Sequence, residues 1–575
     1  MLKIRVTIVQ LNAHLGDFDG NLKKIYNAID IAEKNQSDFV VFPELFLTGY
    51  PPEDLVLRTS FLKKNIEYIN KIVSYSKDKK TVILIGYIDV EDDAFNSLAI
   101  IHNGKFLGKY HKHLLPNYSV FDEHRYFKSG NEITIIEYNN IKIGINICED
   151  IWSPIGPLHY QVLNGTQLII NSSASPYFYG KRKLRKKYLS TKSYDYHCPI
   201  VYCNLVGGQD EVVFDGGSIV TTSEGNIMYE CKPFEEEIVT LDIPIEENLR
   251  TNLQDPRRRH ISSTKIPNIN IIKISNKIER KTKINVSTKN FSLKREEEIF
   301  KAVTLGLRDY IIKNGFKKVV IGLSGGMDSS LVAAIAVEAL GKDNVLGILM
   351  PSMYSSSHSI EDAKNLAENL GIKYYIIKIE NIYYSFVNEL KEIFSNTKED
   401  ITEENLQARI RGTILMAISN KFGHIVLATG NKSEIATGYS TLYGDMVGGF
   451  SPIKDVYKTD VYKMAKWYNK FKGKEIIPQN VFVKPPSAEL RPNQKDQDTL
   501  PPYEILDEIL KLYIEKELSV EEISEKFDKE TVKYVAKLVD KNEYKRRQGV
   551  IGVKVSERSF GKDRRMPITS KYKEW

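Results

Sequence analysis

The sequence predicts an α/β protein built from two domains, each with a sheet of its own. The chain has 575 residues, and a single hydrophobic core stops growing at roughly 250–300 residues. Short apolar segments alternate with amphipathic helical segments along most of the chain, as they do in layered α/β folds. Hydrophobic residues make up 42% of the sequence, so both halves can bury a core.

The first domain is expected over residues 1–260. Its predicted strands are the apolar segments 4–11, 38–44, 80–88, 141–148 and 166–174. The amphipathic stretches 21–35 and 61–76 between some of them predict helices. Residues 261–290 are rich in Lys, Asn, Ser and Ile and have no helical period, so we expect a linker or crossover there.

The second domain is expected over residues 291–575 and shows a regular alternation of strands and helices. A helix at 293–313 leads into a strand at 317–323 and a glycine-rich turn. The predicted elements that follow are a helix at 328–340, a strand at 344–350, a helix at 359–370, a strand at 373–379, a helix at 405–420 and a strand at 424–430. This alternation predicts a doubly wound parallel sheet.

Composition excludes several classes of protein. A net charge of +7 on so long a chain does not by itself indicate nucleic-acid binding. The four cysteines form no CxxC pair, which fits a reducing compartment. The first residues are too polar for a signal peptide, and no apolar run reaches the roughly 18–20 residues of a membrane span. We expect a cytoplasmic protein that binds neither nucleic acid nor a membrane.

Three polar residues in the first half lie at or just past the ends of predicted strands: Glu44, Lys112 and Cys148. Sites in layered α/β proteins gather at the carboxyl ends of strands, so these side chains can converge. A thiol becomes a strong nucleophile as the thiolate, and a nearby lysine favours that form. Glu44 can take the thiol proton and return it to leaving ammonia, so the set suits an amidase.

The same residues also have structural interpretations. A single cysteine after a strand is often a small buried apolar residue, and a single lysine or glutamate is usually a solvated surface group. His111 and His113 form an HxH pair that would suit a metal, but the sequence shows no third ligand. The residues alone therefore leave both interpretations open.

Four separated strings resemble the nitrilase (carbon–nitrogen hydrolase) superfamily and occur in that family's order: FPELFLTGYPPEDL, YHKHLLPNYSVFDEHRYF, GINICEDIW and NSSASPY. The resemblance implies an αββα sandwich in which Glu44 is the general base and acid, Lys112 the cationic helper and Cys148 the nucleophile. More closely, residues 1–250 resemble the glutaminase domain of glutamine-dependent NAD synthetases. That likeness implies that Glu123 is a further carboxylate near the triad. It also implies three glutamine contacts, at Tyr118, Ser175 and Lys181.

The string GLSGGMDSS joins a predicted strand to a predicted helix at 322–330. Glycines let backbone amides approach phosphate oxygens, and a helix N-terminus adds about half a positive charge. A Walker A loop would carry a lysine after its second conserved glycine; Asp328 stands near that point instead. A carboxylate among phosphates suits Mg²⁺. A glycine-rich turn without a ligand is the structural alternative.

This loop resembles that of the ATP pyrophosphatase (adenine nucleotide alpha hydrolase-like) superfamily, whose products are AMP and pyrophosphate. The resemblance implies an ATP site made of Gly322, Leu323, Ser324, Gly325, Gly326, Met327, Asp328, Ser329 and Thr429. Residues 404–420 and 428–462 look like the signature of NAD synthetases, and residues 485–503 match a segment that closes over substrate. The likeness implies deamido-NAD contacts at Asn405, Glu434, Asp498 and Lys545, with Mg²⁺ on Asp328 and Glu434.

Together these features predict a two-site enzyme that amidates deamido-NAD with ATP and with ammonia released from glutamine. Making ammonia inside the protein avoids its protonation and dilution, and the family implies an internal route and a homo-oligomer. The main alternative is a stand-alone amidase or nitrilase with a nucleotide-sensing second domain. A tRNA-modifying adenylating enzyme and a non-catalytic interaction protein are two further alternatives.

Overall fold

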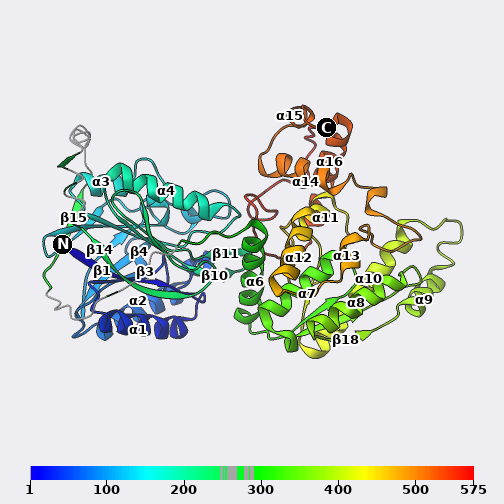
Figure 1. The fold of residues 1–575 in the computed structure, drawn as a ribbon, viewed down its shortest axis with the longest axis horizontal. Helices are drawn as coiled ribbons and strands as arrows, with labels where there is room; N and C mark the ends of the chain where they lie inside the picture. Colours follow the sequence, from blue (N-terminus) through cyan, green and yellow to red (C-terminus); the bar gives the residue numbers. More distant parts are fainter. Residues whose placement is uncertain (1, 246–249, 251–252, 255–267, 277–283, 285–289) are drawn as a thin grey trace. The chain divides into compact units, whose positions relative to one another are not determined.

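The computed structural model describes residues 2–245, 250, 253–254, 268–276, 284 and 290–575. The chain divides into two compact units (Figure 1). The first unit comprises Met1–Gln209 and Phe214–Ser292, and the second comprises Asp210–Val213 and Leu293–Trp575. Along the chain, the main division therefore falls between Ser292 and Leu293.

Two sheets form the frame of the first unit. Within the described residues, one sheet has the order β14-β1-β2-β3-β4-β5 and the other β13-β12-β9-β8-β7-β6-β15. The strands of the first sheet are β1 (Lys3–Gln10), β2 (Phe39–Val41), β3 (Val82–Val90), β4 (Ala94–His102), β5 (Lys105–His111) and β14 (Glu237–Pro244). Those of the second are β6 (Ile133–Tyr138), β7 (Ile141–Ile147), β8 (Leu168–Ser173), β9 (Ile200–Asn204), β12 (Ile219–Thr221), β13 (Ile227–Glu230) and β15 (Ile269–Ile274). A small separate pair comprises β10 (Val206–Gln209) and β11 (Val212–Asp215).

The two sheets pack face to face through one apolar core. That core takes side chains from both sheets, among them Ile8 and Val41 from one and Ile145 and Val201 from the other. Helices lie on the outer faces: α1 and α2 contact the first sheet, and α3 and α4 the second (Figure 1). Their bounds are α1 (Phe18–Lys34), α2 (Thr59–Tyr75), α3 (Pro157–Leu163) and α4 (Lys181–Tyr196). The expected αββα sandwich is confirmed.

The predicted linker is partly a strand. Residues Ile269–Ile274 form β15, which pairs in parallel with β6 from Ile269↔Ile133 to Ile274↔Tyr138. This pairing adds β15 to the edge of the second sheet of the first unit. Its asparagine and lysine hid it among the polar residues of 261–290. Residues 261–267, 277–283 and 285–289 of that segment lie outside the described residues.

A parallel sheet of order β18-β17-β16-β19 forms the centre of the second unit. Its strands are β16 (Val319–Gly322), β17 (Val345–Leu349), β18 (Lys373–Ile376) and β19 (Ile425–Leu427). Counted along the chain the order is 3-2-1-4, so the direction of winding reverses between β16 and β19. Ligands of doubly wound sheets bind at that reversal, beyond the carboxyl ends of the strands. The predicted doubly wound sheet is confirmed.

Helices surround this sheet, and α7 and α10 both contact β16. The helices of the region are α6 (Arg295–Lys313), α7 (Met327–Leu340), α8 (Ser357–Leu370), α9 (Glu380–Leu390), α10 (Ile401–Phe422), α11 (Lys432–Thr437), α12 (Lys458–Lys472) and α13 (Gln479–Val483). The sequence prediction did not include α9. It also began α10 at 405, whereas Asp400 caps that helix by accepting a hydrogen bond from the Thr402 N–H at 2.8 Å.

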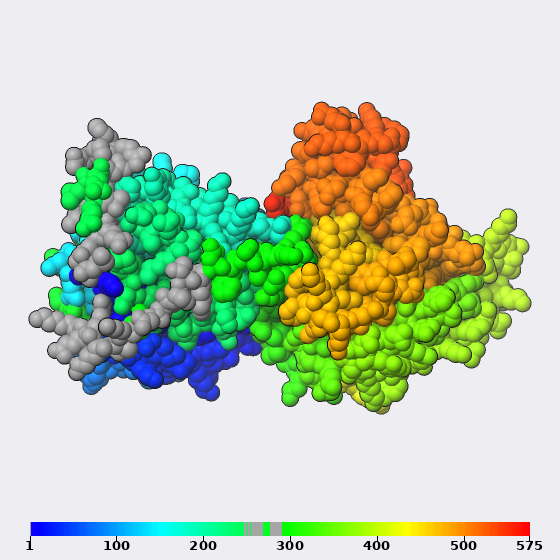
Figure 2. Space-filling model, viewed as in Figure 1, coloured from blue at the N-terminus to red at the C-terminus, as the bar shows by residue number. Residues whose placement is uncertain are grey.

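The C-terminal residues form a helical lobe with an apolar core of its own, and Figure 2 shows it in orange within the second unit. The lobe contains α14 (Tyr503–Leu510), α15 (Val520–Ser524), α16 (Lys529–Lys541) and α17 (Glu543–Arg546). Among the described residues, no helix is both long enough and apolar enough to cross a membrane.

Candidate active sites

Glu44 lies just beyond β2 and is 1% exposed. Its Oε1 accepts hydrogen bonds from Asn96 Nδ2 and Lys112 Nζ, each at 2.7 Å. Its Oε2 accepts one from the backbone N–H of Ala174 at 2.9 Å. Donors from three separate segments therefore hold both carboxylate oxygens in place.

Lys112 directly follows β5, where its backbone N–H donates to the carbonyl of Asn96 at 2.8 Å. Its ammonium contacts Glu44 at 2.7 Å and Glu123 at 2.9 Å, and Tyr50 also donates to Glu123 at 2.6 Å. Burial acts to lower the pKa of Lys112, but the charges of Glu123 and Glu44 outweigh it and raise that pKa well above its usual range. Lys112 is therefore a fixed buried cation.

Cys148 begins a short 3-10 turn, η3 (Cys148–Ile151), directly after β7. Its φ is +42°, a left-handed conformation that is uncommon for a residue other than glycine and that clusters at functional sites. Burial and the charge of Glu44 raise the pKa of the Cys148 thiol well above its usual value, whereas Lys112 acts to lower it. Lys112 thus acts in the expected direction without making the resting thiol a thiolate.

Two of the glutamine-contact residues predicted from the sequence, Tyr118 and Lys181, lie beside the turn at Cys148. Tyr118 Oη donates to both oxygens of Glu149 at 3.0 Å. Lys181 is the first residue of α4, and its ammonium lies 4.0 Å from the centre of the Trp152 ring. Burial and then the charge of Arg185 lower the pKa of Lys181 to about 8.

Ser175 is 3% exposed, and its backbone N–H donates to Asn204 Oδ1 at 2.9 Å. The sequence analysis missed Glu149, which directly follows the nucleophile in the string ICEDIW. Burial raises the pKa of the Glu149 carboxyl. The sequence did offer a signal for Glu149, because it is an acidic residue directly beside the predicted nucleophile.

The HxH pair does not converge on one point. Within the described residues, His111 groups with Asp89 and Glu91, whose ligand atoms all lie within 4.8 Å of one another, and His113 is not among them. Lys109 already supplies the positive charge there, because its ammonium contacts Asp89 at 2.6 Å and also contacts Glu91.

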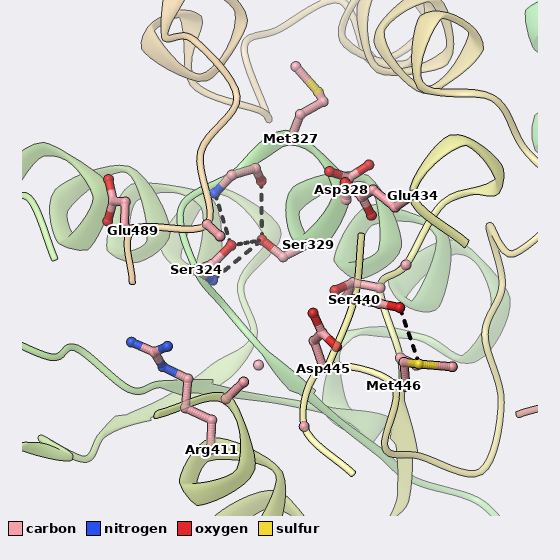
Figure 3. Close-up of a pocket in the computed structure, with 18 of the residues that line it drawn as sticks. Ser324, Met327, Asp328, Ser329, Arg411, Glu434, Ser440, Asp445, Met446 and Glu489 are labelled. Atoms are coloured by element: carbon pink, nitrogen blue, oxygen red, sulfur yellow. Dashed lines mark hydrogen bonds between the residues drawn. The ribbon is translucent and has the colours of Figure 1, made fainter. Parts of the chain in front are cut away.

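The second unit contains a pocket of about 310 Å³ at the reversal of the sheet (Figure 3). It is lined by Gly322, Leu323, Ser324, Gly326, Met327, Asp328, Ser329, Thr429 and Glu434, all of which the sequence predicted for ATP, metal or substrate. Gly325 supports the loop instead. Its φ is +75°, and a Cβ there would lie 2.1 Å from the carbonyl oxygen of Ser359.

Hydrogen bonds within the loop hold its serines. Ser324 Oγ lies 3.0 Å from Ser329 Oγ and accepts from the Gly326 N–H at 3.2 Å (Figure 3). Helix α7 begins at Met327, immediately after the glycines. Its free N–H groups therefore belong to the pocket wall, which suits an anion such as phosphate.

Asp328 and Glu434 lie together in the pocket (Figure 3). Lys458 contacts both: its ammonium donates to Asp328 Oδ2, and to Glu434 Oε1 at 3.2 Å. Asn431 also donates to Asp328 Oδ1 at 3.0 Å. Burial and the charge of Asp328 raise the pKa of Glu434 to about 8, although Lys458 opposes the rise.

The donor set fits a divalent cation. The carboxylate of Asp496 also lines the pocket, so three acids share the positive charge of Lys458. Hard carboxylate oxygens are the ligands that Mg²⁺ prefers in proteins. The sequence analysis missed Lys458 and Asp496. Lys458 stands in the string DVYKTDVY at the first position of α12, with no spacing that ties it to the loop.

Three predicted deamido-NAD contacts do not line the pocket, and their side chains bond elsewhere in the second unit. Asn405 Oδ1 accepts from Thr441 Oγ1 at 2.7 Å, and Asp498 Oδ2 accepts from the Lys495 N–H at 3.0 Å. Lys545 Nζ donates to the carbonyls of Gly438 and Ser440 at 2.9 and 3.0 Å. Ser440 lines the pocket, so Lys545 braces its wall.

Arg411 and Glu489 are among the further charged residues that line the pocket and that the sequence analysis did not assign. Arg411 lines it (Figure 3). Its Nε donates to the Met350 carbonyl at 3.1 Å. Burial lowers the pKa of Arg411 to about 10, against the charges of Glu489 and Asp445. Glu489, from the segment predicted to close over substrate, also lines the pocket.

Comparison with known proteins gives the same two parts. A family model described as carbon-nitrogen hydrolase matches residues 5–248, and one described as NAD synthase matches residues 299–549. The chain is 58% identical to the glutamine-dependent NAD(+) synthetase of Thermotoga maritima over all of both chains. It is 48% identical to that of Aquifex aeolicus, over 99% of this chain and 100% of the relative.

Solved structures agree over the whole length. A glutamine-dependent NAD+ synthetase from Acinetobacter baumannii, in complex with ADP, is 38% identical with a TM-score of 0.75, covering 100% of both chains. One from Cytophaga hutchinsonii is 23% identical with a TM-score of 0.79, over 99% of this chain and 98% of that one, and supports the fold alone. The chain therefore belongs to the family of glutamine-dependent NAD(+) synthetases.

Proposed function

We propose that this chain converts deamido-NAD to NAD, using ATP and the ammonia that it releases from glutamine. The observation that carries the proposal is that one chain contains both sites: the buried Glu44–Lys112 pair at 2.7 Å beside Cys148, and the SGGMDS pocket. The other products are AMP, pyrophosphate and glutamate. The reaction makes the chain a carbon–nitrogen ligase.

In the first site, Cys148 attacks the side-chain carboxamide carbon of glutamine. Glu44 takes the thiol proton and delivers it to the leaving ammonia, so a γ-glutamyl thioester forms. Water then attacks the thioester, with Glu44 acting as base and Cys148 regaining its proton. Lys112 supports this chemistry as a fixed cation beside the developing negative charge, and the 2.9 Å contact with Glu123 helps to hold it.

Charges around the first site match the two ends of an amino acid. Glu149, held by Tyr118 at 3.0 Å, offers a carboxylate to the α-ammonium of glutamine. Lys181 offers an ammonium to the α-carboxylate. Ser175 adds a buried polar group next to Ala174, whose N–H already binds Glu44.

In the second site, the N-terminus of α7 and the hydroxyls of Ser324 and Ser329 bind ATP phosphates. Thr429 lies across the same pocket. The carboxylate of the deamido-NAD nicotinate ring attacks the α-phosphorus, so pyrophosphate leaves and an acyl-adenylate forms. Ammonia then displaces AMP. The Acinetobacter baumannii relative, which binds ADP, supports an adenine nucleotide here.

Asp328 and Glu434 would hold Mg²⁺ in this pocket, and the ion would compensate the charge of the pyrophosphate. Lys458 contributes a further positive charge between the two carboxylates. We assign deamido-NAD to Asn405, Glu434, Asp498 and Lys545 on family likeness. The support from geometry is uneven, because only Glu434 lines the pocket directly.

The proposed domains are residues 1–260 and residues 291–575, joined by a connecting segment at 261–290. The proposed partner is a second copy of the chain. Exposed apolar side chains on the second unit support association. Edge strand β18 and helix α9 expose Tyr375, Ile376, Ile382, Tyr384 and Phe386. Exposed apolar patches of this kind mark interfaces.

One assay tests the function. The purified chain is mixed with ATP, Mg²⁺, glutamine and deamido-NAD, and nucleotides are separated by chromatography. The proposal predicts NAD and AMP in equal amounts, with glutamate formed at least as fast. Glutamate formation without NAD or AMP, at a rate indifferent to deamido-NAD, would instead establish the amidase with a nucleotide-sensing domain.

A further inference from the structure

Asp150 is the second residue after Cys148, and its side chain is fully buried at 0% exposure. It belongs to the same turn, η3, as the nucleophile. Its Oδ2 accepts a hydrogen bond from the backbone N–H of Ile147 at 3.1 Å. That bond fastens the turn to the end of β7, directly before the left-handed backbone of Cys148.

The same carboxylate also holds the segment that carries Lys112. Tyr110 Oη donates to Asp150 Oδ2 at 2.7 Å. The backbone N–H groups of His113 and Leu114 donate to Oδ1 at 3.2 and 2.9 Å. These donors lie on both sides of Lys112 along the chain, so one side chain ties the lysine segment to the nucleophile turn.

We propose that Asp150 is a positioning residue that fixes the Cys148 thiol and the Lys112 ammonium relative to each other during glutamine hydrolysis. The inference rests on the proposed glutaminase and deepens it. All four neighbours of the carboxylate are donors, so both oxygens must accept. An ionised aspartate does this, whereas asparagine has one acceptor and an NH₂ group that would face donors.

The first test is Asp150→Asn in the full-length chain, measured as glutamate released from glutamine. A misplacement of about 1 Å in a catalytic constellation can cost about 10²-fold in rate. We expect kcat for glutamine hydrolysis to fall by about 100-fold while KM for glutamine changes by less than about threefold. Among the described residues, the Asp150 side chain makes no hydrogen bond to Glu149, Tyr118, Ser175 or Lys181, the proposed glutamine contacts. NAD synthesis from added ammonium should keep the wild-type rate.

A matched control separates positioning from general stability. Asp38 is also buried, at 3% exposure, and accepts from a tyrosine hydroxyl (Tyr138, 2.9 Å) and a backbone N–H (Arg5, 2.7 Å). It lies before β2, whereas Glu44 lies after it. Asp38→Asn should lower the melting temperature about as much as Asp150→Asn does, yet keep kcat for glutamine within about threefold of wild type.

A milder variant covers a failure of Asp150→Asn to fold. Tyr110→Phe removes one of the four donors and leaves the carboxylate with its three backbone partners. We expect kcat for glutamine hydrolysis to fall about three- to tenfold at unchanged KM. Wild-type kcat in a folded Tyr110→Phe protein would count against the proposal when Asp150→Asn does not fold.

Alkylation of Cys148 gives a readout that needs no glutamine. Iodoacetamide is added, and the modified cysteine is identified by peptide mass. Slower alkylation in Asp150→Asn than in Asp38→Asn supports the positioning role. Wild-type kcat in Asp150→Asn, or an equal loss in Asp38→Asn, overturns it. If the wild-type chain released no glutamate from glutamine, both the proposed function and this inference would be wrong. If the wild-type chain releases glutamate and Asp150→Asn does so at the same rate, only this inference is wrong.

Discussion

In the first site, the buried carboxylates of Glu44 and Glu123 outnumber the one buried ammonium, that of Lys112. Lys112 contacts two carboxylates, Glu44 and Glu123, at 2.7 and 2.9 Å. Burial, and then the charge of Glu44, raise the pKa of the Cys148 thiol well above its usual value. A thiolate there would add a further buried negative charge. We therefore expect proton transfer from Cys148 to accompany attack on substrate rather than precede it.

Lys181 gives the first site a pH dependence. Burial and the charge of Arg185 lower its pKa to about 8. Below that pH the ammonium is charged and can bind the α-carboxylate of glutamine, as proposed; above it the charge is lost. We expect KM for glutamine to rise about tenfold between pH 7 and pH 9, with kcat much less affected. Steady-state glutamate release across that range measures it.

Lys181→Arg is the matched control, because arginine keeps its charge throughout this range. Its KM should stay flatter above pH 8, which separates Lys181 from the titration of glutamine itself. Parallel KM profiles in the wild type and Lys181→Arg would show that Lys181 does not bind the carboxylate.

Asp328 carries a prediction for the second site. Asp328→Ala removes a proposed metal ligand and a partner of Lys458, so both glutamine- and ammonium-dependent NAD synthesis should fall by more than about 100-fold. AMP formation measures the loss. Asp343→Ala, which removes an acidic side chain outside the pocket lining, should act like the wild type. Ammonium-dependent synthesis that survives in Asp328→Ala would refute the metal role.

At the scale of elements, strongly apolar or strictly alternating segments could be predicted from the sequence. Strands β1, β7 and β8 and helices α6 and α7 lie within a few residues of their predicted positions. Strand β15 was missed because its pairing with β6 joins residues far apart in sequence, from Ile269 to Ile133. Helix α9 was missed because only Tyr383 is buried along it, so its apolar residues mark no core-facing stripe.

Glu489 docks the segment around it on the first turn of α8. Its Oε1 accepts from Ser359 Oγ at 2.6 Å and from Ser356 Oγ, the N-cap of that helix, at 3.0 Å. Lys484 lies 3.4 Å from the same carboxylate. A hydrogen bond to a charged group contributes about 1.5–3 kcal/mol. Loss of these bonds would release the segment that lines the pocket, so Glu489→Ala should raise KM for ATP by about tenfold or more.

Glu475→Ala is the control for this element. Glu475 accepts from the Gln479 N–H at 2.6 Å at the start of α13 but does not line the pocket. It should leave KM for ATP unchanged. The docking role of Glu489 is wrong if Glu489→Ala binds ATP as tightly as Glu475→Ala does.

Across the whole molecule, the sequence could not predict contacts that form only through the fold, whereas Glu149 stood beside Cys148 in a continuous string and was overlooked. The SGGMDS loop is continuous, so its place between β16 and α7 could be predicted. Lys458 reaches Asp328 from 130 positions away. Asp150 reaches Tyr110 from 40 positions away. No spacing rule predicts such contacts, because the chain between them can take many lengths.

In the proposed function, the first site supplies ammonia to the second. Cys148→Ala tests it most directly, with NAD formation measured from glutamine and from added ammonium on the same preparation. We predict that glutamine-dependent synthesis falls by more than about 10³-fold while ammonium-dependent synthesis stays within about twofold of wild type. Glutamine-dependent synthesis at the wild-type rate in Cys148→Ala would contradict the account.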